Sequence, residues 1–111
     1  MNRPTLRQGD VLLVPVTRMP ARKRTKVVAR DPRGIVLAEG EVTGHFHAIA
    51  DAPDAEFVET VDTIDRFLRL RSAGTLTHQE HAAIDVMPGV YKVVIHREYD
   101  ELTMEPRRVV D

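Results

Sequence analysis

The sequence contains no cysteine and no tryptophan, and its aromatic residues are limited to three Phe and two Tyr. The lack of cysteine excludes a disulfide framework, and it means that any bound metal ion must be held by histidine nitrogen and carboxylate oxygen rather than by thiolate. No apolar run approaches the roughly eighteen residues of a membrane span, and the N-terminal stretch lacks the apolar segment of a secretory signal. These absences favour a cytoplasmic protein with no membrane partner.

Motifs of several enzyme classes are missing as well. Neither the glycine-rich dinucleotide fingerprint nor a P-loop occurs, and the single serine, Ser72, has no setting suited to a nucleophilic triad. The sequence therefore gives no support to nucleotide-dependent chemistry or to serine-based hydrolysis.

The residues that are present indicate one small β domain. A chain of 111 residues, 42% apolar and 30% charged, is large enough for a single core and too small for two. Short apolar or alternating runs are separated by turn signals such as Pro88-Gly89, which predicts an all-β barrel or sandwich of about eight short strands. We expect a single domain over residues 1–111. The expected strands lie in residues 11–16, 27–30, 35–38, 45–50, 55–61, 66–71, 90–99 and 107–110.

Two stretches suggest helix. A helix beginning near Asp62 is the alternative to the strand over residues 66–71, where the alternation of apolar and charged residues favours the strand. The stretch from Thr77 to Glu80 has the form of a capping box, which predicts a single helical turn over residues 78–81.

Four of the five histidines stand in two tight clusters, His45-Phe46-His47 and His78-Gln79-Glu80-His81. Alternation along a strand places His45 and His47 on one face, with Cβ atoms roughly 6–7 Å apart. His78 and His81 share a face only if the chain turns between them, as the capping box predicts. Because imidazole is the commonest biological metal ligand, the two clusters predict one shared metal site.

The predicted metal ligands are the four clustered histidines, His45, His47, His78 and His81. Zinc is the default divalent ion for such a set, and Glu39, Glu41 and Glu80 are candidate carboxylate ligands or partners of the ligands. If all four imidazoles bind, the site is structural. If water takes one position, a metal-bound hydroxide could hydrolyse a substrate with Glu80 as general base. The lack of a second catalytic constellation favours a non-enzymatic role.

Residues 40–47, with a glycine followed by a histidine pair, resemble the first metal motif of the cupin family, and residues 88–91 loosely resemble the turn of the second cupin motif. This resemblance implies a metal-bearing β-barrel. The chain also resembles small bacterial and phage proteins that share Gly-Glu-x-Thr-Gly-His-x-His, His-x-Glu-His and a closing Gly-x-Tyr…Arg-Glu-Tyr, here at residues 40–47, 78–81 and 89–99. That resemblance covers most of the chain and implies no particular activity.

Charge is unevenly distributed along the chain, although the net charge is only −1. Residues 1–30 carry eight basic residues and one acid, residues 31–65 carry one base and nine acids, and residues 66–111 carry seven of each. A nucleic-acid patch, a self-complementary interface between identical subunits, or two solvated faces would each produce such a pattern.

The most basic stretch predicts a second candidate site. The cations expected to contact phosphate are Arg22, Lys23, Arg24 and Lys26. No aromatic residues interleave with them, so a stacking platform for single strands is missing, and we prefer a solvated loop. A nucleic-acid or partner-binding module, and a self-assembling homo-oligomeric component, are thus the alternatives to a metal-binding protein.

Overall fold

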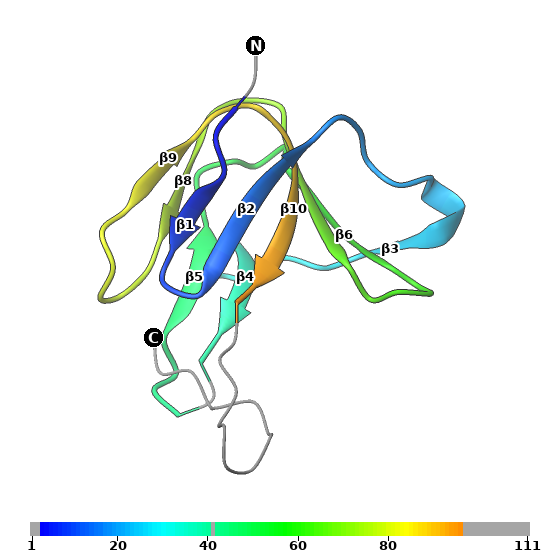
Figure 1. Ribbon diagram of the computed structural model, residues 1–111. Helices are drawn as coiled ribbons and strands as arrows, with labels where there is room; N and C mark the ends of the chain where they lie inside the picture. Colours follow the sequence, from blue (N-terminus) through cyan, green and yellow to red (C-terminus); the bar gives the residue numbers. More distant parts are fainter. Residues whose placement is uncertain (1–2, 41, 97–111) are drawn as a thin grey trace.

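The computed structural model describes residues 3–40 and 42–96, which fold into two antiparallel β-sheets that face each other (Figure 1). Within these residues the only helix is the short 3-10 turn η1, at Arg22–Arg24. The strands are β1 (Leu6–Gln8), β2 (Val11–Val16), β3 (Thr25–Val27), β4 (Ile35–Glu39), β5 (Phe46–Ile49), β6 (Glu56–Thr60), β7 (Arg66–Leu70), β8 (Gly74–Thr77), β9 (Ile84–Val86) and β10 (Gly89–Ile95). The predicted all-β class is confirmed.

The larger sheet has six strands in the order β1-β2-β10-β7-β6-β3, and the smaller sheet has four in the order β4-β5-β8-β9. Every pairing in both sheets is antiparallel. None of the described helices is of the length and apolarity that a membrane crossing requires.

A single core lies between the sheets, because alternate residues of the strands point inward. Leu13, Leu68 and Tyr91 of the larger sheet and Leu37 and Leu76 of the smaller one are at most 2% exposed and belong to one apolar cluster. Each such side chain stabilises the fold by roughly 1.5–3 kcal/mol on leaving water. The packing of the two inner faces makes the protein a sandwich.

The structure corrects several expected boundaries. Residues 66–70 form a strand, so the alternative helix there is wrong. Three further strands, β1, β8 and β9, were not predicted from the sequence. The expected helical turn over residues 78–81 is a bend, while the helical turn that is present lies in the basic segment. The expected strand over residues 107–110, and the end of the one over residues 90–99, lie outside the described residues.

The turn between β4 and β5 explains the glycines of the histidine motif. Gly44 has a φ of 73°, in the left-handed region that favours glycine. The Gly40 N–H donates to the carbonyl of His45 over 2.7 Å, and the His45 N–H donates to Thr43 Oγ1 over 3.1 Å. These residues therefore close the loop and deliver the chain to the start of β5.

Candidate functional site

The two histidine clusters meet at one end of the sandwich. There the turn between β1 and β2, the start of β5 and the loop between β8 and β9 lie together, toward the lower left of Figure 1. The first of these segments belongs to the larger sheet and the other two to the smaller sheet. This end of the molecule therefore joins residues from both layers.

The pairing of β5 with β8 explains why clusters about thirty residues apart in sequence come together. Ala48 pairs with Thr77, and Ile49 pairs with Leu76. In an antiparallel register the residue before Ala48, His47, then lies opposite the residue after Thr77, His78. Their ring centres are 4.3 Å apart. Register, rather than a helical turn, assembles the site.

The remaining histidines of the clusters surround this pair. The ring of His78 lies 4.6 Å from that of His81 and 5.5 Å from that of His45, measured between ring centres. The rings of His47 and His81 are stacked, with centres 6.1 Å apart. The structure thus brings together all four predicted ligands.

His47 differs from the other three because it is completely buried, with an exposed fraction of 0%. Its Nδ1 lies 2.9 Å from Gln8 Oε1, and its Nε2 lies 3.2 Å from Asp10 Oδ1. Both partners come from the far sheet, Gln8 as the last residue of β1 and Asp10 from the turn that follows it. A buried imidazole is thereby held from both sides by polar side chains.

The hydrogen bonds of Gln8 determine which nitrogen of His47 carries a proton. Gln8 Nε2 donates to the carbonyls of Leu76 and Ala82, over 2.9 and 3.0 Å, so Oε1 is the atom that faces the ring. That oxygen can only accept a hydrogen bond, so His47 Nδ1 must donate. In a neutral ring the lone pair of Nε2 then faces the carboxylate of Asp10. Two such acceptors at 3.2 Å repel unless a cation, either a proton or a metal ion, lies between them.

His78 has a different hydrogen-bonding arrangement. Its Nδ1 accepts the backbone N–H groups of Glu80 and His81, over 3.0 and 3.3 Å. The His78 side chain thus binds the Glu80 N–H, which the side chain of Thr77 would have accepted in a capping box. A neutral ring that accepts at Nδ1 carries its proton on Nε2, so its one lone pair is already engaged. His78 could bind a metal ion only after its ring rotates away from these two N–H groups and turns that lone pair toward the ion.

The predicted carboxylates occupy less central positions. Glu39, exposed at the end of β4, forms an ion pair with Arg33 over 3.2 Å. Glu80 is exposed in the β8–β9 loop. Glu41 lies outside the described residues. Over the described ranges, no three His, Asp or Glu side chains are already disposed around one point as metal ligands.

Sequence reading missed Gln8 and Asp10. Both flank Gly9 in a turn, where polar residues are ordinary, and neither belongs to a recognisable motif. Their burial, 4% and 9% exposed, is visible only once the sheets are packed.

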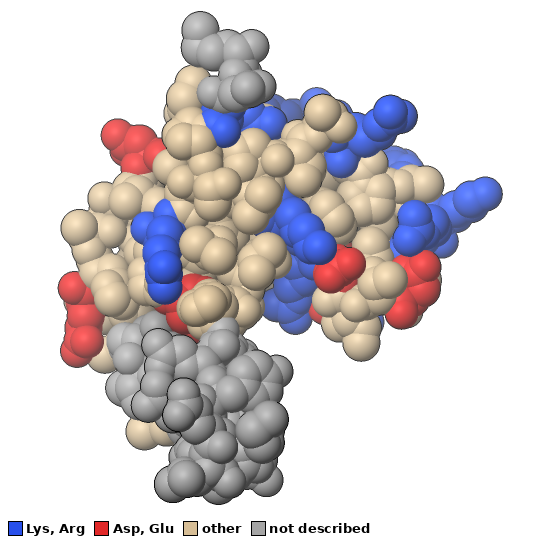
Figure 2. Space-filling model, in the orientation of Figure 1, with Lys and Arg blue, Asp and Glu red and all other residues tan. Residues whose placement is uncertain are grey.

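The predicted nucleic-acid residues lie on η1 and β3, at the edge of the larger sheet that is far from the histidine end (Figure 1). All four are exposed. Basic side chains are exposed on this side of the molecule (Figure 2). Arg24 pairs with Asp62 over 3.1 Å, and Lys26 pairs with Glu59 over 3.4 Å. Part of the charge asymmetry along the chain is therefore resolved within the molecule, by ion pairs between the basic segment and the acidic one.

No curated protein and no solved structure matches the chain. A family model, described as a domain of unknown function (DUF8820), matches residues 7–104. This match spans both histidine clusters, Gln8 and Asp10, and the chain therefore belongs to the DUF8820 family.

Proposed function

We propose that this protein binds a divalent metal ion, with zinc as the first candidate, at the histidine end of the sandwich. The paired atoms His47 Nε2 and Asp10 Oδ1 would hold the ion from inside the fold. Further ligands would come from His45, His81 and, after rotation of its ring, His78.

The observation that carries this proposal is the close approach of His47 Nε2 and Asp10 Oδ1. Two ligands bonded to one ion at about 2.0–2.2 Å lie about 2.8–3.5 Å apart for bond angles near 90–109°. The observed distance of 3.2 Å falls inside that range. The bond from His47 Nδ1 to Gln8 is also the arrangement that metal-binding histidines use, because it fixes the tautomer and the ring orientation.

The other imidazoles favour a metal ion over a proton in this position. Rings that share an ion have centres roughly 4.5–6.5 Å apart for bond angles between 90° and 180°. The four measured spacings, 4.3, 4.6, 5.5 and 6.1 Å, cover nearly the same range. A metal ion could use lone pairs from rings at these spacings, that of His78 after its ring has rotated, whereas additional protons on neighbouring rings repel one another.

A structural role fits this arrangement better than hydrolysis. His47 is closed off from solvent, and Asp10 belongs to the larger sheet while the histidines belong to the smaller one. An ion bound by both would clasp the two sheets at this end. Glu80, the candidate general base, projects from an exposed bend whose backbone is tied to His78.

The test is the metal content of protein purified without a histidine tag and supplied with zinc. We expect about one ion per chain, and a gain in unfolding free energy of about 2.7 kcal/mol when free zinc is a hundred times its dissociation constant. His81→Ala removes an exposed ring of the cluster and should lower zinc affinity. His96→Ala is the matched control, because His96 is also exposed and its contact with Asp10 is made by the backbone N–H.

Two results would overturn the proposal. One is wild-type protein that binds no zinc at stoichiometric concentration. The other is a nitrogen NMR spectrum in which both ring nitrogens of His47 remain protonated after zinc is added, since a proton would then bridge the ring to Asp10.

A further inference from the structure

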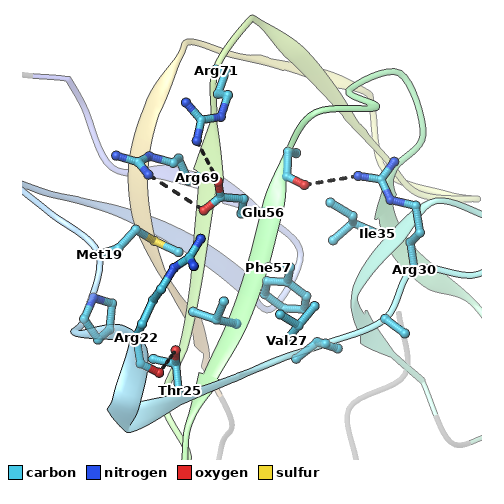
Figure 3. A pocket seen from close by; sticks show the side chains of 15 residues that line it. Met19, Arg22, Thr25, Val27, Arg30, Ile35, Glu56, Phe57, Arg69 and Arg71 are labelled. Carbon is cyan, nitrogen blue, oxygen red and sulfur yellow. Dashed lines mark hydrogen bonds and ion pairs between the residues drawn. The ribbon is translucent and has the colours of Figure 1, made fainter.

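A groove lies beside the basic segment, and its lining shares no residue with the histidine site. It is lined by residues of η1, β3, β6 and β7 (Figure 3). Its volume of about 820 Å³ falls in the range of small-molecule pockets, about 300–1,000 Å³. One end of the groove is strongly cationic, and the rest of its wall is mainly apolar. The exception is Arg30, on the other side of the groove, whose guanidinium donates to the carbonyls of Ala52 and Ala55 (Figure 3).

Three arginines gather around one carboxylate at the cationic end. Arg71 Nη2 lies 2.8 Å from Glu56 Oε1, Arg69 Nη1 lies 3.7 Å from Glu56 Oε2, and the side chain of Arg22 extends toward the same carboxylate (Figure 3). The pairing of β6 with β7 explains part of this cluster, because Glu56 and Arg69 are cross-strand partners. The hydrogen bond from Arg71, followed by the charges of Arg71, Arg69 and Arg22, holds the pKa of Glu56 below its usual value.

The charges at this end do not balance. Three guanidinium groups face one carboxylate, which leaves an excess of two positive charges. A carboxylate ligand would neutralise one of them, whereas a phosphate monoester carries about −1.5 to −2 charges at pH 7 and offers three acceptor oxygens. Arginine is also suited to phosphate, because its planar guanidinium donates two parallel hydrogen bonds.

The apolar wall indicates what the phosphate is attached to. Val27, 79% exposed on the edge strand β3, lines the groove together with Val28, Met19 and Ala55. Exposed apolar surface beside a cationic cluster fits a ligand with an apolar body and an anionic head.

We propose that this groove binds a small organic phosphate monoester with an apolar body, its phosphate held by Arg22, Arg69 and Arg71. A nucleic acid fits the groove less well. Its flat bases need exposed aromatic rings on which to stack, and the one aromatic residue of the lining, Phe57, is only 2% exposed.

Octyl phosphate is the probe, titrated calorimetrically into the full-length protein. We expect one molecule to bind per chain, and octanol and inorganic phosphate each to bind at least about tenfold more weakly, because each lacks one half of the recognised structure. Octanoate, with a single charge, should also bind more weakly.

Arg22→Gln and Lys23→Gln form a matched pair of variants. Both residues are exposed neighbours on η1, but only Arg22 lines the groove. Arg22→Gln should weaken octyl phosphate binding about tenfold, the usual loss for a hydrogen bond between charged groups, while Lys23→Gln leaves it unchanged. Circular dichroism verifies that both variants are folded.

Several outcomes would overturn the proposal. They are the absence of octyl phosphate binding at millimolar concentration, equal affinity for octanoate or octanol, and an equal loss in the two variants. Tighter binding of a single-stranded oligonucleotide, weakened alike by Arg22→Gln and Lys23→Gln, would instead assign the basic segment to nucleic acid. None of these results depends on zinc, so they leave the metal proposal to its own test.

Discussion

The histidine end and the arginine groove are both clusters of one residue type, yet the fold treats them in opposite ways. At the histidine end, His47 is fully buried and its polar partners come from the other sheet. In the groove, Arg22 and Arg71 are exposed. The carboxylate that both face, Glu56, lies on β6 of the larger sheet, and none of the three residues comes from the smaller sheet. The histidine cluster therefore connects the two sheets, whereas the arginine cluster is built on the larger sheet alone.

This difference has an energetic consequence. A polar group withdrawn from water must be matched by its partners, and removing one partner leaves the others buried and unsatisfied. Exposed ion pairs are hydrated before and after they break, so they contribute little. Substitutions should therefore affect stability strongly at the histidine end and weakly in the groove.

The largest effect is expected for His47→Ala. The substitution empties a buried site and leaves Gln8 Oε1 and the Asp10 carboxylate facing a cavity, and breaking a buried polar pair of this kind costs about 3–5 kcal/mol. Urea unfolding at equal zinc concentration measures the loss, with His96→Ala as the exposed control. If the two variants lose the same small amount, the buried network does not stabilise the fold and the contrast between the regions fails.

An intermediate effect is expected for Gln8→Leu. Leucine keeps the apolar bulk of the side chain but removes the donors to the carbonyls of Leu76 and Ala82 and the acceptor for His47. Unsatisfied buried groups cost about 1–3 kcal/mol, and losing the partner of a ligating histidine typically weakens metal binding by about 10–100-fold. Competition with a chromophoric chelator measures the affinity. Arg7→Leu, on the exposed side of β1, should change neither quantity.

The parts of the fold and of the candidate site that could be predicted are those whose signal lies in a short stretch of sequence. The largely apolar runs of β2 and β10 and the alternation along β7 are local signals, and the sequence predicts these strands well. The convergence of His47 with His78 was predicted from residue chemistry alone, and the register that causes it could not be read from the sequence. Gln8 and Asp10 were missed because they act only through contacts between the two sheets. The short strand β1 and the turn after it have no recognisable motif, and their contact with His47 of the smaller sheet is set by the packing of the sheets.

The smallest effect is expected in the groove, from the titration of Glu56. Because Arg71 and the neighbouring arginines lower the pKa of Glu56 in the folded protein, its ionised form stabilises the fold above the usual carboxyl pKa of 4.5, and this contribution disappears as the pH falls through the lowered value. Glu56→Gln should therefore reduce stability at pH 7 by less than about 1 kcal/mol, since water screens the partly exposed pair, and the difference from wild type should shrink as the pH falls below the usual carboxyl pKa. Urea unfolding at pH 7, 5 and 3 measures it, and added salt should shrink the difference at pH 7. A loss as large as that of His47→Ala, or one that does not shrink between pH 5 and pH 3, would mean that Glu56 stabilises the fold through packing rather than through charge, and that the groove is as much a part of the core as the histidine end.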